Sequence, residues 1–438
     1  MDAQGPRRME FRPAGPLRGR VRVPGDKSIS HRVLMLAAMA RGRSTIRGLS
    51  DGGDVRATAD ALRAMGVRIE TDGGNCHVDG VGTGGLLRPE TIVDLRNSGT
   101  SARLLMGLVA THPITAAFAG DASLSGRPMR RVIEPLSRLG ADISAAPAGR
   151  LPLSIRGLCP AAPLTHRLTL PSAQVKSALL LAALNVPGVT TVVEAIATRD
   201  HSERMLARFG ADIEVDGPEI RLRGEAELKP IDLRIAGDPS AAAFLIVAAL
   251  IVPGSELVVE SVGINPLRTG LLDLLREMGA DLSLSNLREE GGEPVADVTS
   301  RHSPLTAIDV PPDRAPRMID EFPIFFVAAA FASGTTRTRG LAELRVKETD
   351  RLAAMAAGLS ALGLGIREET DGLVVEGKSG EPIPGGATVV SRLDHRVAMS
   401  FAVAGLHARA AVTVDDMTPA DTSFPGFTAL LDSLTGQG

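Results

Sequence analysis

The sequence opens a helix in the same way six times, at intervals of roughly seventy residues. In each copy, residues typical of a helix start precede a run rich in Ala, Leu and Met. A regular repeat of this length indicates one supersecondary unit that is copied along the chain. The six openings are Asp26-Lys27-Ser28, Asn97-Ser98-Gly99-Thr100, Pro171-Ser172-Ala173-Gln174, Gly237-Asp238-Pro239-Ser240, Asp320-Glu321-Phe322-Pro323 and Asp394-His395-Arg396.

A second motif recurs in phase with the first. It has a Leu, a hydrophobic residue three positions later and then a Gly, as at residues 62–66, 136–140, 206–210, 275–279 and 359–363. The apolar pair lies on one helix face, and Gly suits the position that follows a helix end. Each copy therefore predicts a helix that leads into a strand, and the whole repeat reads helix, strand, helix, strand, strand.

The repeats divide the chain into three plus three. Pro24 precedes the first opening and Ile235 precedes the fourth, so we expect chain crossings near residues 23 and 236. The predicted domains are residues 24–235, and residues 236–438 together with residues 1–23. The strand region before Pro24 is expected to pair with the C-terminal half. The predicted class is α/β (α+β).

Composition excludes several classes of protein. The 438 residues are 44% hydrophobic, which supplies buried cores, but no apolar run is long enough to span a bilayer. The first twenty residues lack the apolar stretch of a secretory signal, so we expect a cytoplasmic protein with no membrane partner. Cys76 and Cys159 show no metal-ligand spacing, which predicts no metal site. A net charge of −3 and the absence of Trp and Tyr argue against a nucleic-acid partner.

Cations stand at the first opening, where free backbone N–H groups and the helix dipole favour an anion. Ser28 can cap this helix, and Lys27 and Arg32 are expected to point at the same volume. Taken alone, the segment also fits a capped surface helix with two solvated cations. Because cations oppose the dipole at a helix start, by ~0.3–1 kcal/mol each, their presence favours an anionic ligand.

The second and third openings add small residues and more donors. Gly99 allows a ligand to approach the backbone, and Arg127 is held between Gly and Pro, which suits capture of a carboxylate or phosphate. An ordinary cap and a solvated loop Arg are the structural alternatives. Ser172, Ala173, Gln174 and Lys176 form the third opening, and Arg199 precedes the following helix. We interpret Asp200 and Ser202 as caps, and the fourth opening, which has no cation, as purely structural.

The C-terminal half carries the acid–base candidates. Asp320 and Glu321 precede a very apolar helix, and Lys347, Glu348 and Arg351 are predicted to share the first turn of another. The alternative is a charged turn held by weak pairs of ~0.2–0.5 kcal/mol each. His395, at the sixth opening, is more typical of a cap region than of a catalyst.

Together these segments resemble the 5-enolpyruvylshikimate-3-phosphate synthase family. The likeness runs from about Pro24 to the C-terminus. It rests on residues 25–32, 97–100, 127–129, 172–174, 345–351 and 393–396. The resemblance implies two domains of three βαβαββ units, with helices inside and sheets outside, that close on substrates in the cleft between them. It implies transfer of the enolpyruvyl group of phosphoenolpyruvate to the 5-hydroxyl of shikimate 3-phosphate, with release of phosphate, in the route to chorismate and aromatic amino acids. No cofactor and a monomeric state are expected.

Site residues are carried over from the family position by position. Those implied for shikimate 3-phosphate are Lys27, Ser28, Arg32, Ser172, Ala173, Gln174, Arg199, Asp320 and Lys347. Those implied for phosphoenolpyruvate are Lys27, Gly99, Thr100, Arg127, Gln174, Arg351 and Arg396. Protonation of the enol carbon needs an acid, and removal of the hydroxyl proton needs a base. Our hypothesis assigns Glu348 to the first step and Asp320 to the second, with Lys27 assisting either transfer.

The chain departs from the family pattern in three places. A C-terminal Lys-Thr-Phe run, which contacts phosphoenolpyruvate in many relatives, is Thr422-Ser423-Phe424 here. One subgroup shares this loss together with an Arg-Asp-His run like residues 199–201, and we place the chain in that subgroup. Glu343 stands where others have Asn. Tolerance to the herbicide glyphosate in the subgroup goes with Ala at the position of Gly99, so we expect this chain to be sensitive.

Two other functions fit part of the pattern. The sister UDP-N-acetylglucosamine enolpyruvyltransferases share the fold and the reaction type. They carry a Cys in the loop where this chain has Asp121-Ala122-Ser123. A non-catalytic repeat scaffold for an acidic partner explains the repeats. It does not explain why cations gather at the helix openings.

Overall fold

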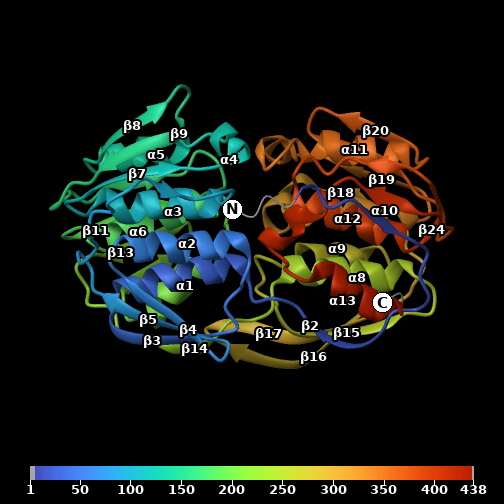
Figure 1. The fold of residues 1–438 in the computed structure, drawn as a ribbon, viewed down its shortest axis with the longest axis horizontal. Coiled ribbons are helices and arrows are strands. Elements are labelled where there is room, and N and C mark those ends of the chain that lie inside the picture. The colour runs from blue at the N-terminus through green and yellow to red at the C-terminus, as the bar shows by residue number, and fades with distance from the viewer. Residues whose placement is uncertain (1–4, 437–438) are drawn as a thin grey trace. The chain divides into compact units, whose positions relative to one another are not determined.

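The computed structural model describes residues 5–436. They form two compact units (Figure 1). The first unit comprises residues 25–235 and 290–293, and the second comprises residues 5–24, 236–289 and 294–436. The short return at residues 290–293 is the tip of a hairpin whose strands begin and end in the second unit. The sequence predicted chain crossings near residues 23 and 236 only, and it did not predict this return.

Three similar sheets build the first unit. The sheets have strand orders β14-β3-β5-β4, β6-β7-β9-β8 and β10-β11-β13-β12. In each, the first two strands are parallel and the remaining pairs are antiparallel. The strands are β3 (Arg41–Arg47), β4 (Arg68–Asp72), β5 (Asn75–Val81), β6 (Val93–Asp94), β7 (Thr115–Ala119), β8 (Asp142–Ala146), β9 (Arg150–Arg156), β10 (Thr165–Arg167), β11 (Val189–Val193), β12 (Asp212–Asp216), β13 (Glu219–Arg223) and β14 (Asp232–Arg234).

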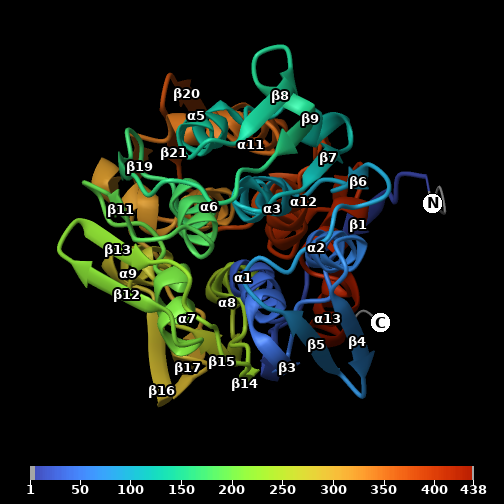
Figure 2. The ribbon, with the colours of Figure 1, turned by 90° about the vertical axis from the view of Figure 1, so that its left-hand side faces the viewer.

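The helices of the first unit fill the space inside these sheets (Figure 2). They are α1 (Lys27–Met39), α2 (Gly53–Ala64), α3 (Gly99–Ala110), α4 (Ala122–Gly126), α5 (Arg130–Arg138), α6 (Ala173–Ala183) and α7 (His201–Arg208). Helices α1, α3 and α6 begin at the first three openings and are buried over most of their length. Helices α2, α5 and α7 are more amphipathic, because each also presents a polar face to solvent.

The second unit repeats this plan with strands from both ends of the chain. Its sheets have orders β16-β17-β15-β2, β18-β19-β21-β20, β1-β25-β23 and β22-β24. The strands are β1 (Met9–Phe11), β2 (Arg18–Arg22), β15 (Glu256–Gly263), β16 (Asp281–Glu290), β17 (Glu293–Arg301), β18 (Asp309–Val310), β19 (Thr335–Thr338), β20 (Ile366–Glu369), β21 (Gly372–Glu376), β22 (Ile383–Gly385), β23 (Thr388–Val389), β24 (Ala408–Ala410) and β25 (Val412–Val414). The helices are α8 (Pro239–Ile251), α9 (Gly270–Glu277), α10 (Phe322–Phe331), α11 (Arg351–Ala361), α12 (His395–Gly405) and α13 (Phe427–Thr435).

The expected N-terminal strand is confirmed. Strand β2 pairs in parallel with β15, which belongs to the fourth repeat. Conversely β14, which precedes the fourth opening, pairs in parallel with β3 of the first repeat. The α/β class is also confirmed. The sixth repeat departs from the predicted unit: η3 (Thr418–Thr422) and α13 follow β25, and β1 supplies its antiparallel partner.

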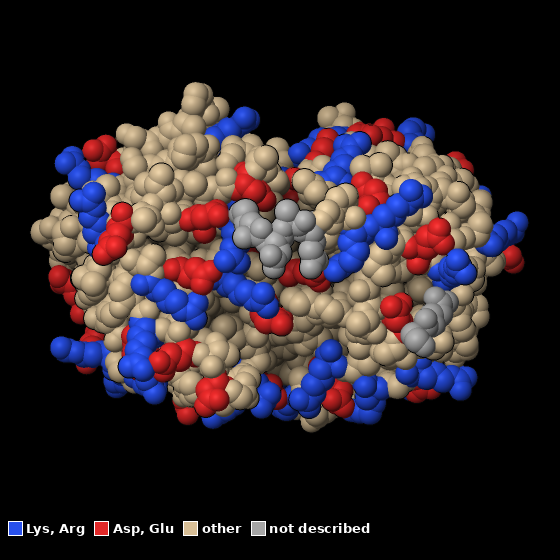
Figure 3. Space-filling view, in the orientation of Figure 1, with Lys and Arg blue, Asp and Glu red and all other residues tan. Residues whose placement is uncertain are grey.

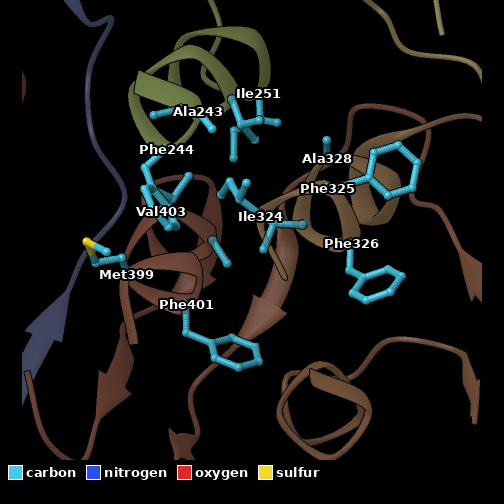
Figure 4. Packing of buried hydrophobic residues seen from close by; sticks show 14 of the residues in the cluster. Ala243, Phe244, Ile251, Ile324, Phe325, Phe326, Ala328, Met399, Phe401 and Val403 are labelled. Atoms are coloured by element: carbon cyan, nitrogen blue, oxygen red, sulfur yellow. The ribbon is translucent and has the colours of Figure 1, made fainter. Parts of the chain in front are cut away.

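Three apolar helices form the centre of the second unit. Every residue of α10 and of α12 is buried, as is every residue of α8 after Pro239. A helix that is hydrophobic on all sides is stable only inside a core. Figure 4 shows Phe244 of α8, Phe325 and Phe326 of α10 and Phe401 of α12 among smaller aliphatic side chains. The uncharged bodies of these helices leave their N-terminal turns as the places where polar groups gather.

The predicted glycines follow the second helix of five repeats. Gly66, Gly140, Gly210, Gly279 and Gly363 all have positive φ, between 82° and 106°. Only Gly adopts this conformation without steric cost, which explains the recurring motif.

Charge is mixed on one face of the protein. On the face drawn in Figure 3, Lys and Arg side chains are interspersed with Asp and Glu side chains. No helix within residues 5–436 has the length and hydropathy needed to cross a bilayer.

Candidate functional site

The opening of α1 holds Lys27 beside a carboxylate. Lys27 Nζ lies 3.0 Å from Asp54 Oδ2, and both side chains are largely buried. The predicted cap is wrong: Asp26, not Ser28, accepts the hydrogen bond from the backbone N–H of Ile29. Capping by Asp26 leaves the Ser28 hydroxyl for other contacts, and Arg199 Nη1 lies 3.5 Å from it.

Arg32 is buried and held by three oxygens. Its guanidinium donates to Ser202 Oγ at 2.8 Å, to Ser177 Oγ at 2.7 Å and to the backbone oxygen of Ser28 at 2.9 Å. The interpretation of Ser202 as a simple cap is therefore wrong. Asp200 occupies the N-cap position of α7, but its carboxylate makes no capping bond and accepts instead from Arg204 Nε at 2.8 Å.

The second and third openings are joined by side chains. Gln174 Nε2 donates to Thr100 Oγ1 at 3.0 Å, and Gln174 Oε1 accepts from Arg103 Nη1 at 2.8 Å. Ser98 caps α3 and Ser172 caps α6, and Ala173 is the first residue of α6. Arg103, in the second turn of α3, is a further cation near this site that was not predicted, although its place four residues after Gly99 could have suggested it.

Arg127 lies against the opening of α3. It donates to Asn97 Oδ1 at 2.6 Å and to Ser123 Oγ at 3.0 Å. A Cβ added to Gly99 would lie 3.1 Å from Arg127 Nη1 and 2.9 Å from Arg103 Nη1. The missing side chain of Gly99 thus leaves both guanidinium groups close to the start of α3.

Lys176 forms ion pairs inside the first unit. Its side chain is fully buried, with Nζ 2.8 Å from Glu194 Oε1 and 2.6 Å from Glu203 Oε1. Burial raises the pKa of Glu203, and the adjacent Lys176 opposes that rise. The two carboxylates fix Lys176 within the first unit, and the family resemblance assigns it no ligand.

Arg351 is the centre of the charged cluster in the second unit. Its Nε donates to Asp394 Oδ2 at 2.8 Å, Nη2 to Glu348 Oε2 at 2.5 Å and Nη1 to Asp320 Oδ1 at 3.3 Å. Burial alone would lower the pKa of Arg351, but these three carboxylates outweigh it and raise the pKa. The three predicted residues Asp320, Glu348 and Arg351 are therefore brought together, and Asp394, which also caps α12, is a further member.

Lys347 and Glu348 were predicted to lie in the first turn of a helix, but they precede that helix in the structure. Lys347 follows the 3-10 helix η2 (Ala342–Val346), and α11 begins only at Arg351. Asp350 sets this start because its side chain accepts from the backbone N–H of Ala353 and so caps the helix. Lys347 Nζ lies 3.9 Å from Asp320 Oδ1. Desolvation lowers the pKa of Lys347, and Asp320 opposes this.

Arg396 stands in the first turn of α12. Its Nη1 donates to the backbone oxygen of Asp320 at 3.0 Å, which joins the fifth and sixth openings. The sequence suggested that the fourth opening has no cation, but the structure places Arg268 there. Arg268 Nη2 donates to Ser240 Oγ at 2.9 Å and lies 3.5 Å from Asp238 Oδ1. Arg268 comes from the segment before α9, so inspection of the opening alone could not find it.

The departures from the family pattern are also located. Thr422 ends η3, and the Phe424 side chain is buried in the second unit. Glu343 lies within η2. Each unit carries its own set of the predicted site residues. The first unit has Lys27, Ser28, Arg32, Gly99, Thr100, Arg127, Ser172, Ala173, Gln174 and Arg199, and the second has Asp320, Lys347, Glu348, Arg351 and Arg396.

One group of side chains in the first unit has the donors of a metal site. Ligand atoms of Asp200, His201 and Glu293 all lie within 4.8 Å of one another. However, His201 Nδ1 is 2.6 Å from Glu293 Oε1, and the Asp200 carboxylate is paired with Arg204 Nε. The first contact links α7 to the tip of the β16–β17 hairpin, and the second joins two residues at the start of α7.

The chain matches a known family over almost its whole length. The model for EPSP synthase (3-phosphoshikimate 1-carboxyvinyltransferase) matches residues 11–431. The chain belongs to the EPSP synthase family. Its similarity to curated family members is high: it is 60% identical over 434 residues to the 3-phosphoshikimate 1-carboxyvinyltransferase of Sphingopyxis alaskensis, covering 97% of each chain. It is 57% identical to that of Zymomonas mobilis, covering 97% of this chain and 95% of the relative.

Solved structures agree with this membership of the EPSP synthase family. EPSP synthase from Acinetobacter baumannii superposes with a TM-score of 0.87 at 43% identity, covering 98% of each chain. The enolpyruvyl transferase NikO from Streptomyces tendae has a TM-score of 0.76 at 20% identity and supports the fold alone.

Proposed function

We propose that this chain transfers the enolpyruvyl group of phosphoenolpyruvate to the 5-hydroxyl of shikimate 3-phosphate and releases phosphate. The observation that carries the proposal is identity of 57–60% to curated 3-phosphoshikimate 1-carboxyvinyltransferases over nearly the full chain. The reaction belongs to the route to chorismate and aromatic amino acids. A cytoplasmic monomer without cofactor is part of the same proposal.

Each unit supplies cations that suit these acidic substrates. We assign shikimate 3-phosphate to Lys27, Ser28, Arg32, Ser172, Ala173, Gln174, Arg199, Asp320 and Lys347, and phosphoenolpyruvate to Lys27, Gly99, Thr100, Arg127, Gln174, Arg351 and Arg396. Arginine suits the carboxylate and phosphate of phosphoenolpyruvate because its fork of N–H groups donates to two oxygens at once. The buried partners of Arg32 and Arg351 support the binding of shikimate 3-phosphate by the first and of phosphoenolpyruvate by the second, since they hold each guanidinium in one orientation.

The chemistry requires three proton transfers. A proton added to the methylene carbon of phosphoenolpyruvate leaves positive charge on the adjacent carbon, which the 5-hydroxyl oxygen attacks as it loses its own proton. Loss of phosphate from the resulting adduct, with removal of a proton from the methyl group, regenerates the enol ether. We assign the first proton donor to Glu348 and the base to Asp320, with Lys27 assisting.

The surroundings of the two acids support distinct roles. Glu348 accepts a hydrogen bond from Arg351 and must take up a proton before it donates one. Asp320 Oδ1, on the residue that we assign as the base, lies 3.9 Å from Lys347 Nζ and 3.3 Å from Arg351 Nη1. Negative charge from both acids also stabilises the cationic intermediate.

The activity is tested by following phosphate release from phosphoenolpyruvate and shikimate 3-phosphate. We expect turnover with this pair and none when UDP-N-acetylglucosamine replaces shikimate 3-phosphate. Asp320→Ala and Glu348→Ala are each expected to lower kcat by about 10²–10⁴-fold, the usual contribution of general acid–base catalysis. Glu343→Ala, which changes an acid in η2 to which we assign no role, is the matched control. Near-native turnover in both acid variants would refute the assigned roles, and absence of turnover by the unmodified protein would refute the function.

A further inference from the structure

The carboxylate of Glu321 is buried where the openings of three helices meet. Glu321 immediately precedes α10, and its side chain is only 3% exposed. Ser240 of α8, Arg268 and Arg396 of α12 surround it. The proposed reaction assigns no role to Glu321, although a buried carboxylate is costly unless charged or polar partners compensate for it.

Ser240 connects this carboxylate to Arg268. Its hydroxyl donates a short hydrogen bond to Glu321 Oε1 and accepts one of 2.9 Å from Arg268 Nη2. Arg268 Nη2 is itself 4.0 Å from Glu321 Oε1. Because Ser240 and Arg268 are both buried, these contacts hold Glu321 Oε1 in one place.

Arg396 meets the same carboxylate from the opposite helix opening. Its Nη1 is 3.8 Å from Glu321 Oε1 and donates to the backbone oxygen of Asp320 at 3.0 Å. Among residues 5–436, Arg396 Nη2 makes no hydrogen bond to protein. One edge of the guanidinium is therefore fixed by protein, and another is left for an anion.

Charge balance connects the two arginines. Arg268 and Arg396 are two nearly buried cations that share the Glu321 carboxylate, and Arg268 also lies 3.5 Å from Asp238 Oδ1. Loss of the Glu321 charge would remove the carboxylate that these two cations share. The two cations would then repel each other, and Arg396 Nη1 would lose the negative charge that attracts it.

We propose that Glu321 is a positioning residue for Arg396. The Glu321 carboxylate, held by Ser240 and Arg268, fixes the guanidinium of Arg396. The outer N–H groups of Arg396 then face an acidic group of phosphoenolpyruvate. The fourth helix opening thus serves substrate binding indirectly, through Arg268 and Ser240. The inference rests on the proposed function, because it assumes that Arg396 binds phosphoenolpyruvate.

Glu321→Gln tests this role because it keeps the shape and removes the charge. We expect the KM for phosphoenolpyruvate to rise about tenfold, the usual scale for a hydrogen bond to a charged group, while the KM for shikimate 3-phosphate stays within twofold. In an Arg396→Ala background the same change is expected to raise the KM for phosphoenolpyruvate by less than twofold, since a residue that acts through Arg396 has nothing left to position.

Two further variants separate positioning from folding. Asp297→Asn removes another buried carboxylate of the second unit, whose partners are Arg20, Arg288 and the backbone of Ser261, and we expect it to leave both KM values unchanged. If Glu321→Gln does not fold, Ser240→Ala tests the same link, with an expected rise of about threefold in the KM for phosphoenolpyruvate that Ser240→Thr reverses.

Three outcomes would overturn the inference. One is an unchanged KM for phosphoenolpyruvate in Glu321→Gln or, where that variant does not fold, in Ser240→Ala. Another is an equal rise in both KM values, and the third is a full effect of Glu321→Gln in the Arg396→Ala background. Failure of the proposed function is distinguished from these, because the unmodified enzyme would then not turn over the two substrates at all.

Discussion

Gly99 leaves no room for a methyl group without movement of two arginines. An alanine Cβ there would approach Arg103 and Arg127 to 2.9 and 3.1 Å. We predict that Gly99→Ala displaces these side chains and weakens inhibition by glyphosate at least tenfold, with a smaller rise in the KM for phosphoenolpyruvate. Steady-state inhibition assays measure both. Millimolar resistance in the unmodified enzyme, or equal inhibition of the two forms, would contradict the prediction.

Single residues of the site were predictable only where the repeat displays them. Lys27, Gln174 and Arg396 stand at openings that recur in the sequence, so a common role in binding could be proposed for them. The pairing of Arg268 with Ser240, or of Arg351 with Asp394, joins positions 28 and 43 residues apart and depends on how different repeats pack. Caps were less predictable, because Asp26 and Ser28 are both good cap formers and lie two residues apart.

Helices α3 and α6 approach closely at Gly107. An added Cβ at this position would lie 2.2 Å from the backbone oxygen of Ala178, which cannot move without α6. We predict that Gly107→Ala lowers the free energy of unfolding by about 1–3 kcal/mol, because overpacking exceeds the gain in helix propensity of up to ~1 kcal/mol. It should also weaken the Thr100–Gln174 contact, since the two residues stand on the two helices.

Urea unfolding provides the measurement for Gly107→Ala, and Gly358→Ala provides the control. A Cβ added to Gly358 would lie 2.1 Å from the ring of Phe401, so it would meet a side chain and not the backbone of a packed helix. We therefore expect a smaller loss of stability in Gly358→Ala. A larger loss in Gly358→Ala than in Gly107→Ala would show that the backbone contact between α3 and α6 is not limiting.

Elements were more predictable from sequence than their pairing. The period of the openings and the glycines after the second helices indicated the order of helices and strands in five repeats. The incomplete sixth repeat was not predictable in this way, because its antiparallel strand β1 comes from the other end of the chain. The start of α11 at Arg351, later than the sequence suggested, depends on capping by Asp350, which competes locally with a longer helix.

Stability of the whole molecule should fall in mild acid, in part because of His31. Its ring is fully buried, Nδ1 lies 2.7 Å from Thr58 Oγ1, and Nε2 has no hydrogen-bond partner within residues 5–436. Burial lowers the pKa of His31 well below its ordinary value, and Lys27 and Arg32 lower it further. In the unfolded chain the same ring takes up a proton near pH 6.5, so below that pH the unfolded state binds more protons than the folded state.

The free energy of unfolding should therefore decrease as pH falls from 6.5 towards the lowered pKa of His31, by at most about 1.4 kcal/mol per pH unit from this group. Urea unfolding at pH 7.0 and 5.5 measures the difference. His31→Gln, which keeps a polar partner for Thr58 but cannot titrate, should lose less stability over this interval than the unmodified protein. His77→Gln, on strand β5, is the matched control and should behave like the unmodified protein. An equal loss in His31→Gln and the unmodified protein would mean that other groups carry the acid sensitivity.

Phosphate bound beside Lys27 and Arg32 would offset the two charges that disfavour protonation of His31, so the same measurement with shikimate 3-phosphate present should show a smaller loss.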